Sequence, residues 1–267
     1  MVLINNKAII YNNSKSFFWA SRFLSRNILK KVINIYTFCR FHDDLVDEGV
    51  SLGSENEINE LTNTIKRYGI EEKIINELIS GISSDKNFKR YSSNKELLRY
   101  CYKVAGVVGI MMVQTIQIKA KEASYFAIDL GIAMQLTNIA RDVVEDSKNN
   151  RFYIQHDFQD ISDTLTLADL FYKSCFTSIK EIPFNFRFAI LVARRVYRKI
   201  GDEILKTNNI EGYNKAGKIY VNNWGKLYQT VLSLLDLIKL LLTKEKSCYM
   251  SDEHLLINKE VDLNERI

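Results

Sequence analysis

The stretch "FCRFHDDLVDEGV", Phe38 to Val50, places four acidic residues at the end of a segment that otherwise has the pattern of a helix with one buried face. Upstream of it, apolar residues recur at intervals of three, four and seven, which marks an inward stripe. Continuing that stripe from Cys39 in steps of four leads to Asp43 and Asp47. These two carboxylates are therefore expected on the inward face of the helix.

Burying two like charges four residues apart is costly, because they repel each other and lose their hydration. A cation should compensate them, and oxygen ligands on adjacent helical turns suit magnesium, which usually takes one or two protein carboxylates together with substrate phosphates. Asp44 and Glu48 fall nearer the polar side of the same helix. We expect water to solvate those two side chains.

A second polar line occurs in "GIAMQLTNIARDVVEDSKNNRFY", where polar side chains again follow three- and four-residue spacing. The line comprises Gln135, Asn138, Asp142 and Asp146. Apolar residues cover another side of this helix, namely Ile132, Leu136, Ile139 and Val143. Such a helix is expected at the centre of the protein with the polar line facing a cavity. Arg141 and Arg151 lie nearby and suit the negative charge of a phosphate.

The composition favours an all-helical single domain. Among 267 residues there are one proline, Pro183, and 11 glycines, so turn-rich β architectures are poorly supported. A hydrophobic fraction of 46% is ample for a core, and the net charge of +5 without a block of consecutive basic residues argues against a nucleic-acid partner. The four cysteines form no CxxC pair, which favours reduced thiols in a cytoplasm.

Helical patterns with short polar breaks follow one another along the chain. Helices are expected over residues 14–24, 28–48, 54–68, 71–82, 94–120, 122–147, 163–178, 185–207 and 214–243. No linker divides them, so residues 1–245 are expected to form one catalytic domain and residues 246–267 a polar C-terminal tail. The run "VLSLLDLIKLLL", Val231 to Leu242, falls short of a membrane span. It is either a core helix or a face that rests on a membrane.

Two inward carboxylate lines on a helical bundle are what a diphosphate bound through bridging metal ions requires. The segments that carry them resemble signatures of the squalene/phytoene synthase family, whose members join two isoprenoid diphosphates head to head. The similar segments are "SKSFFWASRFL", "IYTFCRFHDDLVDE", "YCYKVAGVVGIMM", "AMQLTNIARDVVEDSKNNRFYI" and, more weakly, "FRFAILVARRVYRKIGDEIL". The resemblance runs from about Ser14 to Leu227 and is strongest to bacterial phytoene synthases. It implies an all-α, isoprenoid-synthase-like helical bundle around a central apolar cavity.

The resemblance also implies roles for residues that match family positions. Magnesium ions, with manganese as the alternative, would be held by Asp43, Asp47, Asn138, Asp142 and Asp146. Diphosphate or the reacting carbons would be contacted by Ser14, Phe17, Tyr36, Arg40, Gln135, Arg141 and Tyr197. Tyr100 matches a tyrosine near the carbocation, and Ala105 and Gly109 match small residues of the prenyl tunnel. Lys218 stands where relatives usually carry an arginine, which keeps the charge and loses the bidentate geometry.

The implied reaction is the condensation of two geranylgeranyl diphosphates to 15-cis-phytoene through prephytoene diphosphate. No GxGxxG motif and no strand pattern is present, so NADPH is not expected and the last cation is expected to lose a proton. The alternatives are a C30 synthase using farnesyl diphosphate to make dehydrosqualene, presqualene diphosphate or squalene, and a relative without catalysis that acts as an assembly or binding protein. A head-to-tail prenyltransferase would leave the "YCYKVAG" similarity unexplained.

The implied product is too hydrophobic to stay in water. We therefore expect a cytoplasmic protein in peripheral contact with the inner face of the cell membrane. The N-terminus lacks the charged region, long apolar region and cleavage site of a secretory signal. The sequence does not show the oligomeric state or the depth of the tunnel, on which the substrate chain length depends.

Overall fold

The structure, a computed structural model, describes residues 10–11, 14–47, 55–88, 90–243, 254–255 and 257. This part of the chain is helical, without a strand, and one isolated bridge pairs Arg90 with Phe152. The helices are α2 (Lys15–Ser21), α3 (Arg26–Asp47), α4 (Glu55–Lys66), α5 (Glu72–Ser83), α6 (Asn94–Cys101), α7 (Val107–Thr115), α8 (Lys121–Lys148), α9 (Phe158–Ser178), α10 (Phe184–Leu205), α11 (Ile210–Ala216) and α12 (Asn223–Leu242). Short turns are η1 (Ser84–Asn87), η2 (Tyr102–Gly106) and η3 (Ile179–Glu181). The all-α prediction is confirmed.

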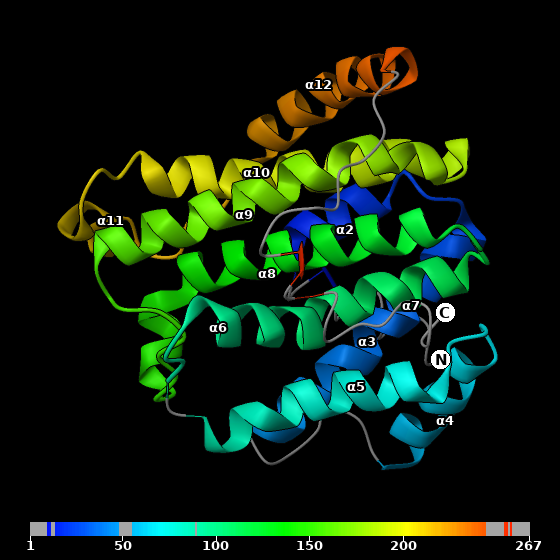
Figure 1. The fold of residues 1–267 in the computed structure, drawn as a ribbon, viewed down its shortest axis with the longest axis horizontal. Helices are drawn as coiled ribbons and strands as arrows, with labels where there is room; N and C mark the ends of the chain where they lie inside the picture. Colours follow the sequence, from blue (N-terminus) through cyan, green and yellow to red (C-terminus); the bar gives the residue numbers. More distant parts are fainter. Residues whose placement is uncertain are drawn as a thin grey trace.

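Helix α8 runs through the middle of the molecule (Figure 1). Helices α9 and α10 lie on one side of it and α6 and α7 on the other, and α12 lies outside α10. The expected apolar side of α8 is buried, with Ile132, Leu136, Ile139 and Val143 at most 7% exposed. The central position predicted for this helix is therefore confirmed.

Several helices begin at side chains that bind the free backbone N–H groups of a first turn. Asp157 accepts a hydrogen bond from the backbone of Asp160 at 2.9 Å and caps α9, which therefore begins five residues before the expected start at 163. Asn222 accepts from the backbone of Gly225 at 2.7 Å and caps α12. The helix expected over 214–243 is divided in two, because the chain leaves α11 at Gly217 with a positive φ of 63°.

The helix expected over 94–120 contains a π-helical turn, η2 (Tyr102–Gly106), between α6 and α7. A π turn inserts extra backbone into a helix and is often found at functional sites. It lies within the "YCYKVAG" segment and brings the backbone of Ala105 against α8. A side chain at Gly131 would place its Cβ 2.3 Å from the carbonyl oxygen of Ala105, and one at Gly109 would lie 2.2 Å from that of Ala127. Both glycines are therefore required by the close approach of α7 and η2 to α8.

The described residues of the C-terminal segment include His254, which is 2% exposed. Its Nε2 lies 3.1 Å from Asp129 Oδ2 of α8 and 3.2 Å from Ser174 Oγ of α9. Ile257 is fully buried and belongs to the main core. The boundary predicted at residue 245 stays a prediction, since most of residues 246–267 lies outside the described part of the chain.

Helix α12 packs on α10 through its polar side. Arg195 of α10 donates two hydrogen bonds to Asp236, from Nε at 2.6 Å and from Nη2 at 2.7 Å. Trp19 of α2 donates to Thr230 at 3.0 Å, and Lys226 is 5% exposed. Most apolar residues of the helix face outward, with Leu240 as a buried exception, so the expectation of a core helix for "VLSLLDLIKLLL" is wrong for most of that run. In the described part of the chain, none of the helices combines the length and apolarity that crossing a membrane needs.

Candidate active site

An apolar cavity of about 320 Å³ lies between α2, α3, α8, α10 and the η2–α7 segment. Its lining is almost entirely aliphatic and aromatic, with a few polar groups, which is typical of a site for a hydrophobic ligand. Residues from the predicted site that line it are Phe17, Tyr36, Ala105, Gly109, Gln135, Asn138 and Tyr197. The tunnel positions Ala105 and Gly109 are thus brought together with the aromatic and amide positions.

The amide and phenol groups of this cavity, on Gln135, Asn138, Tyr36 and Tyr197, lie toward one end of the helices that line it. On α10 the lining runs from Phe186 to Tyr197, and on α8 from Phe126 to Asn138, which is roughly 16–18 Å of helix in each case. On α3 it ends at Cys39. The next inward position on α3 is Asp43 and the next on α8 is Asp142, each one turn further along. Both acidic segments therefore continue from the polar end of the cavity.

Two tyrosines of the cavity contact residues at the start of the described chain. The hydroxyl groups of Tyr197 and Ser14 lie 3.1 Å apart, and the ring of Phe17 stacks on Tyr36 with centroids 5.9 Å apart. Burial raises the pKa of Tyr36, and the nearby Tyr197 and Asp43 raise it further. Burial also raises the pKa of Tyr197. Both phenols are therefore neutral at physiological pH and present aromatic faces and hydroxyl groups rather than charges to a ligand.

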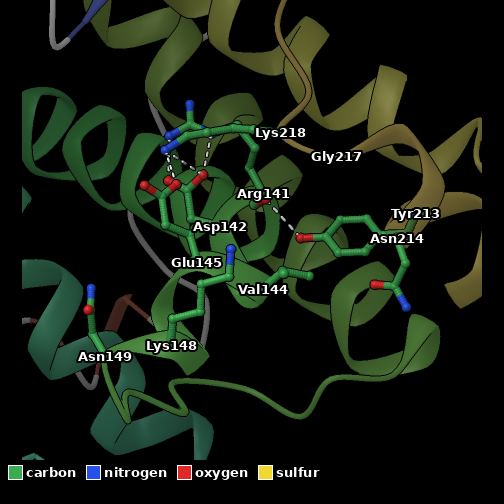
Figure 2. A pocket seen from close by; sticks show the side chains of 10 residues that line it. All are labelled: Arg141, Asp142, Val144, Glu145, Lys148, Asn149, Tyr213, Asn214, Gly217 and Lys218. Carbon is green, nitrogen blue, oxygen red and sulfur yellow. Dashed lines mark hydrogen bonds and ion pairs between the residues drawn. The ribbon is translucent and has the colours of Figure 1, made fainter.

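Asp142 is bound by two cations. Arg141 donates to it from Nε at 2.8 Å and from Nη2 at 2.6 Å, and Lys218 Nζ lies 3.3 Å from Oδ1. Lys218 also pairs with Glu145, and these groups line a second cavity of about 440 Å³ (Figure 2). The charge of Asp142 is therefore compensated by cations of the protein itself. Arg141 also stacks on the ring of Tyr220 at 5.7 Å.

The carboxyl group of Asp146, one turn beyond Asp142, is harder to ionise in the folded protein than in water. Burial raises its pKa to about 7, the charge of Asp142 adds to the rise, and Arg151 opposes it. The folded protein without metal therefore holds a proton on Asp146 up to near-neutral pH. A divalent cation would displace that proton and bind the carboxylate.

The raised pKa of Asp146 predicts a pH-dependent effect of Asp146→Asn on stability. The unfolded carboxyl titrates near 3.8 and the folded one near 7, so the charged aspartate lowers the stability of the metal-free protein increasingly between these pH values and fully above 7. Asparagine lacks this effect. We compare the free energy of unfolding of the variant with that of wild type. This difference should grow in favour of the variant by about 1–2 kcal/mol from pH 5 to pH 8. The difference in Tm should then grow by roughly 2–8 °C.

Thermal melts in EDTA at several pH values measure this, with Asp163→Asn on the exposed side of α9 as the control. The control should show no such pH trend. Equal differences between wild type and Asp146→Asn at pH 5 and pH 8 would contradict the assignment. Adding millimolar Mg²⁺ at pH 8 should raise the Tm of wild type more than that of the variant.

The first acidic segment differs from expectation at Asp44. This side chain was predicted to be solvated, but it is 1% exposed and pairs with Arg40 in the preceding turn. The pair is not an ordinary surface pair, because the side chain of Asp44 is 1% exposed and that of Arg40 30%. Asp43 is half-buried on the inward side as predicted. The side chain of Asp47, the last residue of α3, lies outside the described residues.

Tyr100 is not among the residues that line either cavity. Its hydroxyl donates to Asp85 at 2.7 Å and lies 3.1 Å from the hydroxyl of Tyr153, which also donates to Asp85 at 2.9 Å. The rings of Tyr100 and Tyr153 stack with centroids 5.0 Å apart. The structure thus places Tyr100 in a buried aromatic cluster with η1, and its role near a carbocation stays a prediction.

The donor set at the polar end suits a hard divalent cation. It consists of carboxylate oxygens and the amide of Asn138, and Asp146 is held there at the cost of its charge. Among the described side chains, no three histidine, cysteine, aspartate or glutamate residues converge on one point that would hold a metal. Oxygens of a bound phosphate ligand would therefore complete the coordination shell of magnesium, which usually binds one or two protein carboxylates together with substrate phosphates.

Two tyrosines of the site were missed by the sequence reasoning. Tyr213 is buried and donates to the backbone oxygens of Ala140 at 3.0 Å and Arg141 at 2.8 Å, which holds α11 against α8 (Figure 2). Tyr220 covers the guanidinium of Arg141. The signal that could have found both is the pair of aromatic residues in the otherwise polar segment "EGYNKAGKIYV".

Comparison with solved structures defines the fold class. A dehydrosqualene synthase superposes with a TM-score of 0.72 at 24% identity, covering 89% of this chain and 96% of that one. A squalene synthase from Alicyclobacillus acidocaldarius superposes with a TM-score of 0.61 at 17% identity, covering 79% and 95%. The chain therefore has the helical isoprenoid-synthase fold.

Comparison of the sequence with known proteins points to one family among proteins with this fold. The family model for squalene/phytoene synthase matches residues 52–159. A 15-cis-phytoene synthase from Enterobacter agglomerans is 29% identical, with 73% of this chain and 83% of that protein covered. A 4,4'-diapophytoene synthase from Staphylococcus haemolyticus is 27% identical, with 82% and 91% covered. Together with the fold, these similarities relate the chain to the squalene/phytoene synthase family.

Proposed function

We propose that the protein is a head-to-head prenyltransferase that condenses two geranylgeranyl diphosphates to 15-cis-phytoene through prephytoene diphosphate. The observation that carries this proposal is the cavity whose one end meets both acidic segments. An apolar space of that shape suits a prenyl chain, and carboxylates with basic neighbours at its mouth suit a diphosphate. The similarity to squalene/phytoene synthases supports the same reaction type.

The basic side chains have a defined part in the proposed reaction. Arg141 and Lys218 hold Asp142 and point into the second cavity, so a diphosphate arriving there gains two cations already in place. As the carbon–oxygen bond of one substrate breaks, its diphosphate takes the electron pair, and these cations stabilise the growing negative charge. Bound Mg²⁺, held by Asp43, Asp47, Asn138, Asp142 and Asp146, would supply Lewis-acid neutralisation of the same charge.

The cavity walls act on the carbon skeleton. The double bond of the second substrate attacks the allylic cation left behind, and the intermediate ionises and rearranges to a linear chain. Two diphosphates and two protons leave in all, so no reductant is needed. The neutral rings of Phe17 and Tyr36 stand at the polar end of the cavity, where aromatic faces would stabilise a carbocation. The apolar lining excludes water that would otherwise trap the cation as an alcohol.

A C30 synthase using farnesyl diphosphate is the second candidate. The similarity to the 4,4'-diapophytoene synthase of Staphylococcus haemolyticus favours it, because that relative covers more of this chain than the Enterobacter agglomerans phytoene synthase does. The 29% identity to the latter favours the C20 substrate. Both candidates use the same ionisation chemistry and differ in the chain that the cavity accepts.

Incubation of the purified protein with Mg²⁺ and either geranylgeranyl or farnesyl diphosphate tests the proposal. Mass analysis of the hexane extract should show a C40 product from geranylgeranyl diphosphate and release of two diphosphates per product. A C30 product alone would replace the first candidate by the second. Absence of diphosphate release with both substrates, from a protein that melts cooperatively, would overturn the enzymatic proposal in favour of a binding or assembly role.

A further inference from the structure

One face of α12 is apolar and exposed to solvent. We call it the outer α12 face; its residues are between 46% and 80% exposed and recur at intervals of three and four. They are Trp224, Leu227, Tyr228, Val231, Leu234, Leu235, Ile238, Leu241 and Leu242. Nine large apolar side chains on one face exceed the scattered exposure that is normal for a surface, and such a patch marks an interaction site.

The orientation of α12 is fixed by polar contacts on its inner side. Asp236 is bound by Arg195, and Thr230 accepts a hydrogen bond from Trp19. Gln229 and Ser233 on this side are also buried. A helix that buries its polar residues and exposes its leucines is inverted relative to an ordinary surface helix. The inner polar contacts therefore hold α12 in place. They leave the outer α12 face available to an apolar partner.

Basic residues outnumber acidic ones beside the outer α12 face, where the exposed Glu181 of η3 is next to Lys180, and this balance favours an anionic surface. Within α12, Asp236 points inward and Lys239 is the exposed charged residue. Lys180 lies at the C-terminal end of the helix, where its Nζ contacts the carbonyl of Thr243 at 3.3 Å. Arg22 stacks at 5.5 Å on Trp19, whose ring nitrogen donates to Thr230 of α12. Two copies packed face to face would bring these cations together, whereas negatively charged lipid headgroups would attract them.

The far end of the apolar cavity lies under the same helix. Leu237 and Leu240 of α12 pack in one cluster with Ile182 and Phe186, and the latter two line the cavity. The cavity is thus polar at Asn138 and apolar where it approaches α12. This continuity between an apolar cavity and an apolar outer face also points to lipid as the partner.

We propose that the outer α12 face rests on the surface of an anionic lipid bilayer. The leucine, isoleucine and valine side chains enter the boundary between headgroups and acyl chains, and Trp224 and Tyr228 lie at the headgroup level. Lys239, Lys180 and Arg22 contact the phosphates. The proposal goes beyond the reaction proposed above, and its test requires no turnover, so the two can fail separately.

Vesicle flotation tests the proposal with the full chain. Wild type should float with vesicles of 70% phosphatidylcholine and 30% phosphatidylglycerol and bind pure phosphatidylcholine more weakly. The double variant Leu234→Gln/Ile238→Gln should bind the anionic vesicles at least tenfold more weakly. The control Phe152→Gln/Leu205→Gln removes two exposed apolar side chains elsewhere, 44% and 39% exposed, and should float like wild type.

Fluorescence gives a second readout, because Trp19 and Trp224 are the only tryptophans. In the Trp19→Phe variant, the emission of Trp224 should shift to the blue on adding anionic vesicles and should be quenched by lipids with brominated acyl chains. An unshifted emission together with no flotation would overturn the proposal. It would also be overturned if light scattering showed a dimer that Leu234→Gln/Ile238→Gln dissociates while wild type fails to float, since a second copy would then cover the face.

Discussion

Replacing Asp142 with asparagine is expected to slow diphosphate release by roughly 10³-fold, equal to about 4 kcal/mol of transition-state stabilisation. The carboxylate stands beyond the polar end of the cavity and binds Arg141 through both oxygens and Lys218 through one. Asparagine keeps the size of the side chain and some of the hydrogen bonding. It removes the charge on which both the arrangement of the two cations and the proposed metal ion depend.

Asp43→Asn should cause a loss of similar size, because it removes the charge of the opposite acidic segment. The double variant should lose little more than either single variant, since residues that act on one ligand are not additive. Asp163→Asn on the surface of α9 is the matched control and should keep wild-type activity. Retention of more than a tenth of the activity by Asp142→Asn, measured as released diphosphate, would falsify the paired-carboxylate mechanism.

Gly131→Ala is expected to destabilise the protein by about 2 kcal/mol and lower its Tm by roughly 4–8 °C. The added Cβ would lie 2.3 Å from the carbonyl oxygen of Ala105, a backbone atom in η2 that cannot move alone. Alanine stabilises a helix by about 1 kcal/mol relative to glycine, so the expected loss in free energy of unfolding is the cost of the clash minus this gain. Thermal or urea denaturation of the metal-free protein measures it.

Gly201→Ala is the matched control, since Gly201 also lies within a long helix and is itself buried. Its added Cβ would meet Leu165 Cδ2 at 3.1 Å, the far end of a flexible side chain that can adjust. The helix propensity of alanine should then dominate, and the Tm should stay the same or rise. A Gly131→Ala protein as stable as wild type would show that α8 and η2 can separate without cost. It would contradict the requirement for glycine at this position.

Much of the fold follows from periodicity alone. The inward stripe of α3 and the polar line of α8 were predicted from spacings of three and four, and both acidic segments lie beyond the same end of one cavity. Capping residues such as Asp157 and Asn222 place helix starts to within a few residues, because their side chains satisfy the first backbone N–H groups. The central position of α8 followed from its apolar coverage.

The errors arise where burial depends on neighbours that periodicity does not include. Asp44 lies on the polar side of α3 by pattern, but it is buried in the folded protein and Arg40 compensates its charge. The π turn at η2 has no periodic signal, because it follows from the fit of Ala105 against Gly131. The apolar run of α12 was compatible with either face, and only the contacts with α10 show that it points outward.

The pair between Arg195 and Asp236 has a further consequence for α12. A helix with leucines on one side would bury more apolar surface if it rolled about its own axis, and purely apolar contacts with α10 would permit many such angles. The two hydrogen bonds from one guanidinium to one carboxylate are satisfied at a single angle, and breaking them would strand a buried charge. This ion pair therefore fixes the rotation of α12 about its axis, which keeps the apolar side of the helix exposed to solvent when no partner is bound.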